Sequence, residues 1–260
     1  MRLSNISVRF MRIWQRNLVV YRKIWLVNFL PPLLEPLFYL LAFGVGLSTL
    51  VGDISFEGRE MSYIAFITPS LLAIAIMQNA FFENTYASFV RMYYQKTFDA
   101  MMATPLSLEE VIVGEIMWGA TKSVIAATIM LSVVSAFGLV SYPEALGVLP
   151  LAFLWGFAFG CIGMFFTGIV PSIDMFNLPV FLFITPMFLF SGTFFPLSGL
   201  PEWAQKIAMV LPLTHLVQMT RRLCLGMLTA DLLWPAAYLL LFCVVFFPLA
   251  LASMHRRLIH

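Results

Sequence analysis

Residues 232–254 read LLWPAAYLLLFCVVFFPLALASM, an apolar run that contains no charged side chain. A helix needs about 20 mostly apolar residues to cross the hydrocarbon core of a bilayer, so this run predicts a membrane span. Similar runs recur toward the N-terminus and predict an all-α polytopic membrane protein. The six expected spans are residues 25–50, 63–82, 111–137, 146–170, 176–195 and 232–254.

The composition of the chain supports a membrane location. Of its 260 residues, 61% are hydrophobic and 11% are charged, whereas a soluble domain carries about 25% charged residues. The net charge is +2, and no basic run alternates with aromatic residues, which argues against a nucleic-acid partner. The three cysteines lie far apart in sequence and predict neither a disulfide framework nor a metal site.

The first 23 residues predict an amphipathic helix before the first span. Apolar side chains, Ile13 and Trp14 among them, fall on one side of this helix, and arginines fall on the other. We expect the helix to lie flat in the membrane interface, either as a topogenic anchor or as a mobile gate for an amphiphile. The candidate gate residues are Arg9, Arg12, Trp14 and Arg16.

The distribution of lysine and arginine predicts the orientation of the bundle. Most of these residues precede the first span, follow the second span or follow the last span. Because basic residues are enriched in cytoplasmic segments, we expect both termini on the cytoplasmic side of a bacterial inner membrane. Residues 24–254 would then form one six-span domain, with 255–260 as a cytoplasmic tail.

The connection at residues 83–110 is unusual because its apolar residues recur at helical spacing. Thr104-Pro105 is expected to end this short helix, and Ser107 with Glu110 forms a capping-box pattern that starts the third span. A cytoplasmic helix joined rigidly to a span would suit the transmission of force from a soluble partner. The alternative is an ordinary solvated loop helix.

The connection at residues 196–231 is too apolar for an open loop. Pro201 and Pro212 bracket one short helix, and a second is expected at residues 214–225. Neither is long enough to span the membrane. We expect re-entrant helices that line a protein cavity, with a helix pair on the outer interface as the alternative.

The sequence carries no motif for catalysis or for holding ATP. It has no G-x-x-x-x-G-K-[ST] loop, no H-E-x-x-H and no G-x-S-x-G, so no catalytic residue and no metal ligand are predicted. Ionisable residues inside spans are functional candidates by default, and here they are Glu35, Glu115 and Lys122.

Glu115 and Lys122 are seven residues apart and share one helix face with Trp118. We expect this face to look into the protein or into a wet cavity, where the three residues and Glu35 would line a substrate path. The alternative is a pair of helix-end charges that snorkel or pair for assembly. Glu35 precedes Pro36 in a span that also contains Pro31 and Pro32, where a kink or break is expected.

Several stretches resemble the permease family of type 2 ATP-binding-cassette exporters. They are FSGTFFP at 190–196, LPEW at 200–203 and LPLTH at 211–215, then Arg222 and Gly226, and upstream Thr97, AMMATPL at 100–106 and Gly114-Glu115. The order EPL at 35–37, Arg91-Met92, Gln95-Lys96-Thr97, Ala120-Thr121-Lys122, Pro171-Ser172 with Asp174, and Thr185-Pro186 is similar to the branch of the nodulation lipo-chitooligosaccharide exporter permease. His215 departs from the wider family, in which an aromatic residue is common.

The resemblance implies a partner and a direction of transport. A separate nucleotide-binding ATPase subunit, which carries ATP and Mg²⁺, would dock on residues 91–104, and two permease copies would pair around a central path. The ATPase-coupling candidates are Arg91, Gln95, Lys96, Thr97, Asp99 and Met101. The expected cargo is an amphiphile, in particular a glycolipid or lipid-linked oligosaccharide. The alternatives are drug efflux, secondary transport and a non-transporting membrane assembly or sensor factor.

Overall fold

The computed structural model describes residues 6–47, 52–227 and 233–259. Within them, six helices are long and apolar enough to cross a membrane, which confirms the predicted number of spans. These helices are Trp25–Gly44, Tyr63–Tyr94, Leu108–Ala136, Glu144–Ile169, Ile173–Phe190 and Leu233–Leu258. The predicted ends at residues 50, 231 and 232 lie outside the described residues.

The described chain is almost entirely helical. The α-helices are α1 (Phe10–Lys23), α2 (Trp25–Leu41), α4 (Tyr63–Phe82), α5 (Thr97–Met102), α6 (Leu108–Ala136), α7 (Val148–Ile169), α8 (Asn177–Pro179), α9 (Thr185–Phe190), α10 (Glu202–Val210), α11 (Pro212–Cys224) and α12 (Leu233–Leu258). Turns of π-helix form η2 (Ala42–Leu47), η3 (Glu83–Ala87), η4 (Val90–Tyr94) and η7 (Val180–Ile184), and 3₁₀ turns form η5 (Glu144–Gly147), η6 (Ile173–Phe176) and η8 (Leu197–Gly199). Strands β1 (Asp53–Phe56) and β2 (Arg59–Ser62) pair antiparallel as a hairpin.

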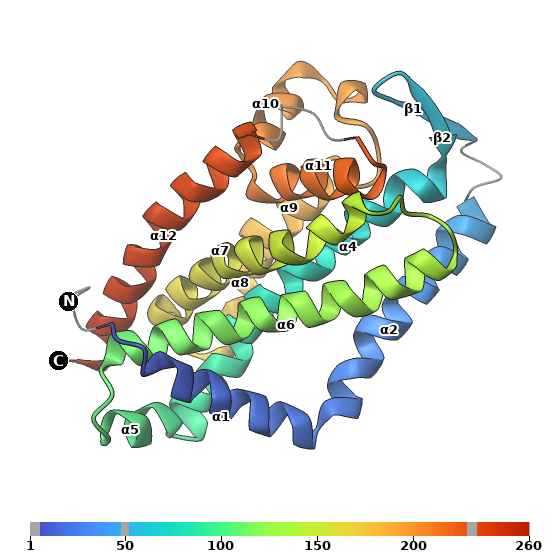
Figure 1. Ribbon diagram of the computed structural model, residues 1–260. Coiled ribbons are helices and arrows are strands. Elements are labelled where there is room, and N and C mark those ends of the chain that lie inside the picture. Colours follow the sequence, from blue (N-terminus) through green and yellow to red (C-terminus); the bar gives the residue numbers. More distant parts are fainter. Residues whose placement is uncertain (1–5, 48–51, 228–232, 260) are drawn as a thin grey trace.

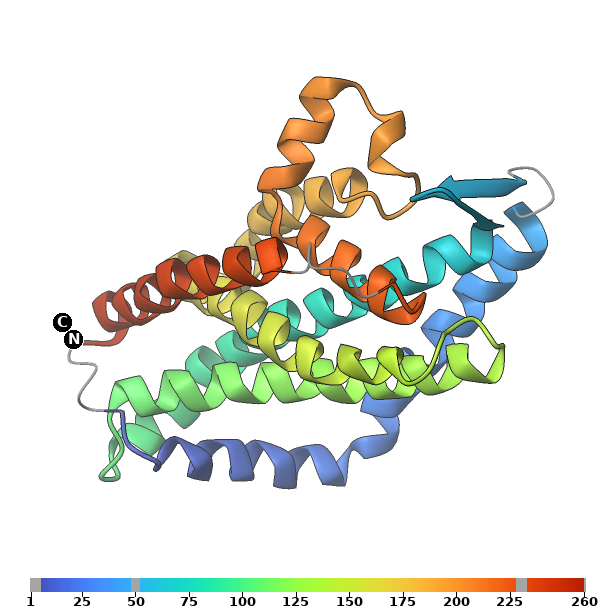
Figure 2. The same ribbon diagram turned by 45° about the horizontal axis from the view of Figure 1, so that its top comes forward.

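The helices α4, α6 and α7 form the centre of the bundle. They pack against one another, α12 lies along α7, α11 lies across α4, and α2 contacts α6 (Figure 1). The spans formed by α2, by residues 173–190 and by α12 contain few buried residues, as expected for helices solvated by lipid. Figure 2 shows both termini and α5 at one end of the bundle, and the β1–β2 hairpin at the other. We call these the terminal end and the hairpin end.

The second span is longer than the sequence predicted. The helix that starts at Tyr63 continues without a loop to Tyr94, because the π turns η3 and η4 extend α4. Residues 83–94 are helical, as their spacing predicted, but they continue α4 instead of forming a separate helix, and their position relative to the membrane stays a prediction. The short helix expected there is α5, which begins only at Thr97.

The expected break in α2 is absent, and α12 extends beyond its predicted end. The three prolines of α2 do not break it, because each proline removes only its own backbone donor and the helix continues around it. The chain instead bends one residue before α2, at Ile24, which leaves helical geometry with φ −120° and ψ 27°. At the other terminus α12 continues to Leu258, so most of the predicted tail is helical.

Other local expectations are confirmed. The Ser107 side chain accepts a hydrogen bond from the Glu110 backbone at 3.2 Å, and the Glu110 carboxylate accepts one from the Ser107 backbone at 2.9 Å. The capping box thus starts α6 where the sequence placed it. The two short helices after the fifth span are also present as α10 and α11. Their depth in a membrane stays a prediction.

Candidate functional site

A buried ion-paired network joins α4 and α6 near the terminal end. Arg91 on η4 places Nη1 2.8 Å from Glu83 Oε1 and Nη2 2.5 Å from Glu115 Oε2. The Glu115 side chain is completely buried, and the Ser88 hydroxyl donates to Glu115 Oε2 at 2.9 Å. Two π turns, η3 and η4, carry Glu83 and Arg91, and such turns are frequent at functional sites.

The network extends to α1 and α2 at its two ends. Lys122 Nζ lies 2.9 Å from Glu83 Oε2 and 3.5 Å from the Asn28 side-chain oxygen. At the other end the Asn17 amide donates to Glu115 Oε1 at 2.9 Å, and Arg16 donates to the Asn17 oxygen at 3.0 Å. One chain of polar contacts therefore connects α1 and α2 to the extended α4 and to α6.

The two carboxylates of the network are fully partnered. Each carboxylate oxygen of Glu83 meets a cation, and both oxygens of Glu115 accept hydrogen bonds. A buried charge that loses its partner is strongly destabilising, whereas a matched pair contributes little net stability. The arrangement therefore fixes how α1, α4 and α6 sit relative to one another more than it stabilises the fold.

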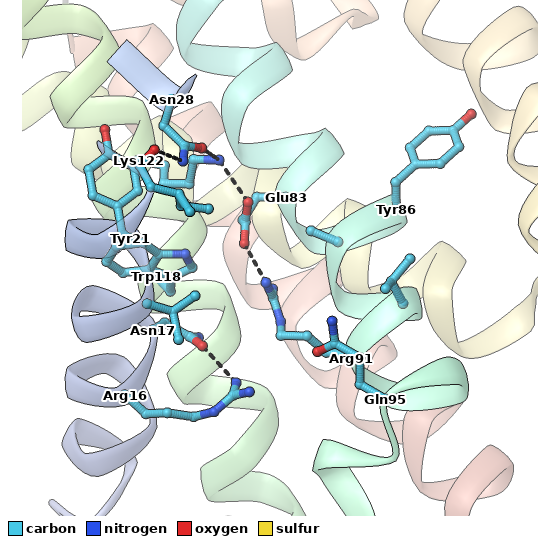
Figure 3. A pocket seen from close by; sticks show the side chains of 14 residues that line it. Arg16, Asn17, Tyr21, Asn28, Glu83, Tyr86, Arg91, Gln95, Trp118 and Lys122 are labelled. Carbon is cyan, nitrogen blue, oxygen red and sulfur yellow. Dashed lines mark hydrogen bonds and ion pairs between the residues drawn. The ribbon is translucent and has the colours of Figure 1, made fainter. Parts of the chain in front are cut away.

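A cavity of about 460 Å³ opens beside this network. Figure 3 shows Glu83 at its centre, between Lys122 and Arg91. The rings of Trp118 and Tyr21 form one wall, with centroids 5.5 Å apart in an edge-to-face arrangement. The remaining lining comes from Arg16, Asn17, Val20, Ile24, Asn28, Tyr86, Ala87, Val90 and Gln95. The cavity thus combines charged groups with aromatic surface.

The two titratable side chains that α1 contributes to this wall are affected by burial. Partial burial lowers the pKa of Arg16, while the Glu115 carboxylate opposes that shift. Burial raises the pKa of the Tyr21 phenol. At neutral pH Arg16 therefore keeps its charge and Tyr21 stays neutral.

The predicted path residues do not all come together. Glu115, Trp118 and Lys122 lie at the network and its cavity, as the shared helix face predicted. Glu35 is half-buried on α2, interacts with Tyr39 one turn later, and lies outside the lining of this cavity. The role of the four residues in transport stays a prediction.

The predicted coupling residues occupy two different environments. Lys96 and Asp99 are exposed at the terminal end, and Lys96 adopts a left-handed conformation with φ 54° that starts α5. Thr97 donates its hydroxyl to the Arg91 carbonyl at 2.8 Å, and Met101 is half-buried. Arg91 itself is not at this surface, because its guanidinium is held by the two carboxylates inside the bundle. Gln95 borders the cavity.

The predicted gate helix is attached to α6 and to the loop after α5. Trp14 donates its indole N–H to Thr121 at 2.8 Å and packs against Trp118. Arg9 donates to the Pro105 carbonyl at 2.8 Å, and Arg9 and Arg12 border a second cavity beside this loop. Helix α1 therefore touches both the loop that follows α5 and the polar cavity, while a gate role stays a prediction.

Sequence reasoning missed two buried charges. Glu83 was placed in the connection after the second span and was not singled out as a site residue. Arg221 lies in the second short helix expected after the fifth span, now α11, and is 2% exposed. It donates to the Phe66 and Gly192 carbonyls at 3.3 and 2.9 Å and lies over the Phe66 ring. Burial lowers its pKa to about 9, so it stays charged at neutral pH.

Fold and site together define a class of protein. Charged and hydrogen-bonding side chains that converge within apolar spans are typical of membrane transport proteins. The family of ABC-2 type transporters matches residues 8–225, and the chain belongs to this family. Permeases of this family lack a nucleotide-binding site and work with an ABC ATPase subunit.

Individual relatives align over almost the whole chain. Nodulation protein J of Rhizobium leguminosarum bv. trifolii is 36% identical over 253 residues, which cover 97% of this chain and 95% of the relative. Nodulation protein J of Rhizobium meliloti (strain 1021) is 34% identical over 246 residues, or 95% and 92% of the two chains. The inner membrane transport permease YadH of Escherichia coli (strain K12) is 21% identical over 244 residues, or 94% and 93%.

Proposed function

We propose that this permease exports an amphiphile, in particular a lipid-linked oligosaccharide or related glycolipid, across the bacterial inner membrane. The observation that carries the proposal is the cavity in which Trp118 and Tyr21 stand beside Glu83 and Lys122. Aromatic rings suit the faces of sugar rings, and the polar groups suit their hydroxyls. The near full-length similarity to the nodulation proteins supports the same class of cargo.

The energy for export comes, in this proposal, from ATP and Mg²⁺ bound by a separate ABC ATPase subunit. The exposed α5 at the terminal end is its docking element, and α1 and α6 carry the movement to the cavity. Supporting contacts are those of Arg9 with the loop after α5 and of Trp14 with α6. ATP binding shifts the permease between two states only if the ATPase contacts those states differently. Two permease copies and two ATPase subunits form the working assembly.

The test uses two exposed residues of the α5 region. Lys96→Asn removes a charge with a residue that tolerates the left-handed backbone, and Asp99→Asn removes the opposite charge. With the tagged chain expressed in its native membrane, we expect both variants to reduce ATPase co-purification or ATP-driven transport of a fluorescent glycolipid at least fivefold. Lys206→Asn, on α10 at the other end of the chain's fold, is the matched control.

Three results would count against the proposal. Recovery of the intact chain without any ATPase in mild detergent would favour a secondary transporter or an assembly factor. Unchanged ATPase co-purification and transport in both α5 variants would show that the ATPase does not dock on α5. ATP-driven uptake of hydrophobic drugs, with no transport of glycolipid, would assign the chain to drug efflux instead.

A further inference from the structure

An apolar groove adjoins the polar cavity and shares one wall with it. The groove has a volume of about 370 Å³, and no charged side chain is among its lining residues. They come from the α1–α2 junction and from α6: Tyr21, Trp25, Phe29, Val124, Ile125, Thr128 and Ile129. Tyr21 belongs to both linings, so a molecule in the cavity can continue into the groove past this ring.

The groove lining is poorly suited to a polar ligand. The Thr128 hydroxyl is used within α6, where it donates to the Val124 carbonyl at 2.7 Å. Trp25 and Phe29 contact each other one turn apart on α2, with ring centroids 6.0 Å apart and ring planes tilted by 59°, and present hydrocarbon surface. A saturated chain is the occupant that such a lining favours, because a hydrocarbon needs no hydrogen-bond partner, whereas a polar group placed there would be left without one.

The cavity has the opposite chemistry, and its acceptors are already used. The Glu83 oxygens are taken by Arg91 and Lys122, and the Glu115 oxygens by Asn17, Ser88 and Arg91. Its donors are less fully engaged. Among the described residues, Arg16 makes one hydrogen bond, to Asn17, and no carboxylate lies within salt-bridge distance of it.

The charge of the site follows from these contacts. Three cations line the cavity, Arg16, Arg91 and Lys122, against the single lining carboxylate Glu83. Counting Glu115 behind Arg91, the site still carries one more positive than negative charge. A headgroup that accepts hydrogen bonds and bears negative charge therefore complements the cavity, and Arg16 is the cation that is not already committed to a carboxylate.

We propose that cavity and groove form one two-part substrate site, which holds a negatively charged headgroup at Arg16 and the attached acyl chain along α2 and α6. This inference rests on the proposed function and narrows its cargo to acidic acyl lipids, such as those with a phosphate, sulfate or carboxylate on the polar part. Tyr21 and Trp118 stand at the junction between the two parts, where headgroup and chain meet.

The experiment uses photo-crosslinking of the full-length chain in phosphatidylcholine nanodiscs. The probes are lysophosphatidylglycerol and lysophosphatidylcholine, each with a diazirine in mid-chain, so they share the acyl chain and differ in headgroup charge. We expect saturable cross-links at residues 25–29 and 124–129, with half-saturation at a tenfold or more lower concentration for the anionic probe. Mass spectrometry locates the cross-links.

Two pairs of variants separate the parts of the site. Arg16→Gln should abolish the preference for the anionic probe and leave the cross-link positions unchanged, whereas Arg22→Gln, exposed on the same helix, should preserve the preference. Thr128→Trp should block cross-linking in the groove, whereas Leu240→Trp on the exposed face of α12 should not. Gel filtration checks that each variant is folded. The cross-link positions in the wild-type chain test the inference even if a variant does not fold.

The outcomes that overturn the inference are distinct from failure of the exporter assignment. Cross-links that do not saturate and spread evenly over α12 and α2 would make the groove ordinary lipid-facing surface. Cross-links between two copies at residues 124–129 would make it a subunit interface. Equal half-saturation concentrations for the two probes would show that the site does not prefer a negatively charged headgroup. Co-purification of the ATPase uses no lipid probe, so it tests the proposed function independently.

Discussion

At the scale of single residues, Arg91 is the centre of the polar network. It holds Glu83 and Glu115 together, while Lys122 also reaches Glu83. If Arg91 is lost, Glu83 keeps a cation, but Glu115 stays buried with hydrogen bonds alone. The two carboxylates therefore depend on Arg91 to different degrees, which makes the network testable by charge removal.

We predict that Arg91→Met lowers the free energy of unfolding by about 3–5 kcal/mol, the cost of leaving a buried charge without its partner. Glu115→Gln should lower the free energy of unfolding by a smaller amount, because Arg91 keeps its ion pair with Glu83. The double variant should be more stable than Arg91→Met alone, since the unpaired carboxylate is gone. Reversible unfolding in mixed detergent micelles gives the three values. If the free energy of unfolding falls in the double variant by the sum of the two single-variant losses, these side chains are not coupled.

At the scale of elements, the central helices meet at glycines. A Cβ added at Gly163 of α7 would lie 2.8 Å from the Phe81 carbonyl oxygen on α4, and one added at Gly119 of α6 would lie 2.0 Å from the Asn84 amide. Small residues at such positions allow membrane helices to approach closely. The close contact brings α6 and α7 against α4 and sets the frame in which the polar network is held.

We predict that Gly163→Ala lowers the free energy of unfolding by about 1–3 kcal/mol, the usual cost of overpacking a tight core. The obstacle is a backbone carbonyl, which cannot rotate away as a side chain can. Gly199→Ala is the matched control, because a Cβ there meets nothing within 4 Å. The same micelle assay measures both, and a neutral Gly163→Ala would mean that α4 and α7 are not held at this distance.

The second span shows how far sequence reasoning reaches at this scale. The six apolar runs were found because hydropathy is a local property, and the capping box at Ser107 is local as well. The continuation of α4 to Tyr94 was missed, since Glu83 and Arg91 read as the polar end of a span. They pair with each other and also with Glu115 and Lys122, which lie 24 to 39 residues further along the chain. Such pairing, and the π turns that enable it, leave no local pattern.

Only part of the candidate site was predicted, again because the sequence reveals local patterns but not contacts between distant segments. Glu115, Trp118 and Lys122 share a face of one helix, so their spacing was enough to group them. Arg16 and Tyr21 reach the cavity only because the chain bends at Ile24 and packs α1 along α6 (Figure 1). That contact joins segments about one hundred residues apart, and amphipathic periodicity alone cannot locate the surface on which such a helix packs.

At the scale of the whole molecule, charge is distributed unequally between the two ends. The basic residues of α1 with its N-cap, of the start of α5 and of the last turn of α12, all at the terminal end, are Arg9, Arg12, Arg16, Arg22, Lys23, Lys96, Arg256 and Arg257. Toward the other end lie Arg59 on β2, Lys206 on α10, the buried Arg221 on α11, and Arg222, which is paired with Glu57 at 2.8 Å. Since cytoplasmic segments are enriched in lysine and arginine, the terminal end with α5 is expected in the cytoplasm, where ATP is available to a partner subunit.

This orientation can be tested with single cysteines in intact cells. The native Cys161, Cys224 and Cys243 are first replaced by alanine. We predict that Glu60→Cys, in the exposed hairpin, reacts with a membrane-impermeant maleimide from outside, whereas Ile259→Cys reacts only after the inner membrane is permeabilised. Neither change removes a basic residue, so neither alters the charge that sets the orientation. The reverse labelling pattern would place α5 outside the cell, where no ATPase could dock on it, and the direction of transport proposed for this permease would fail with it.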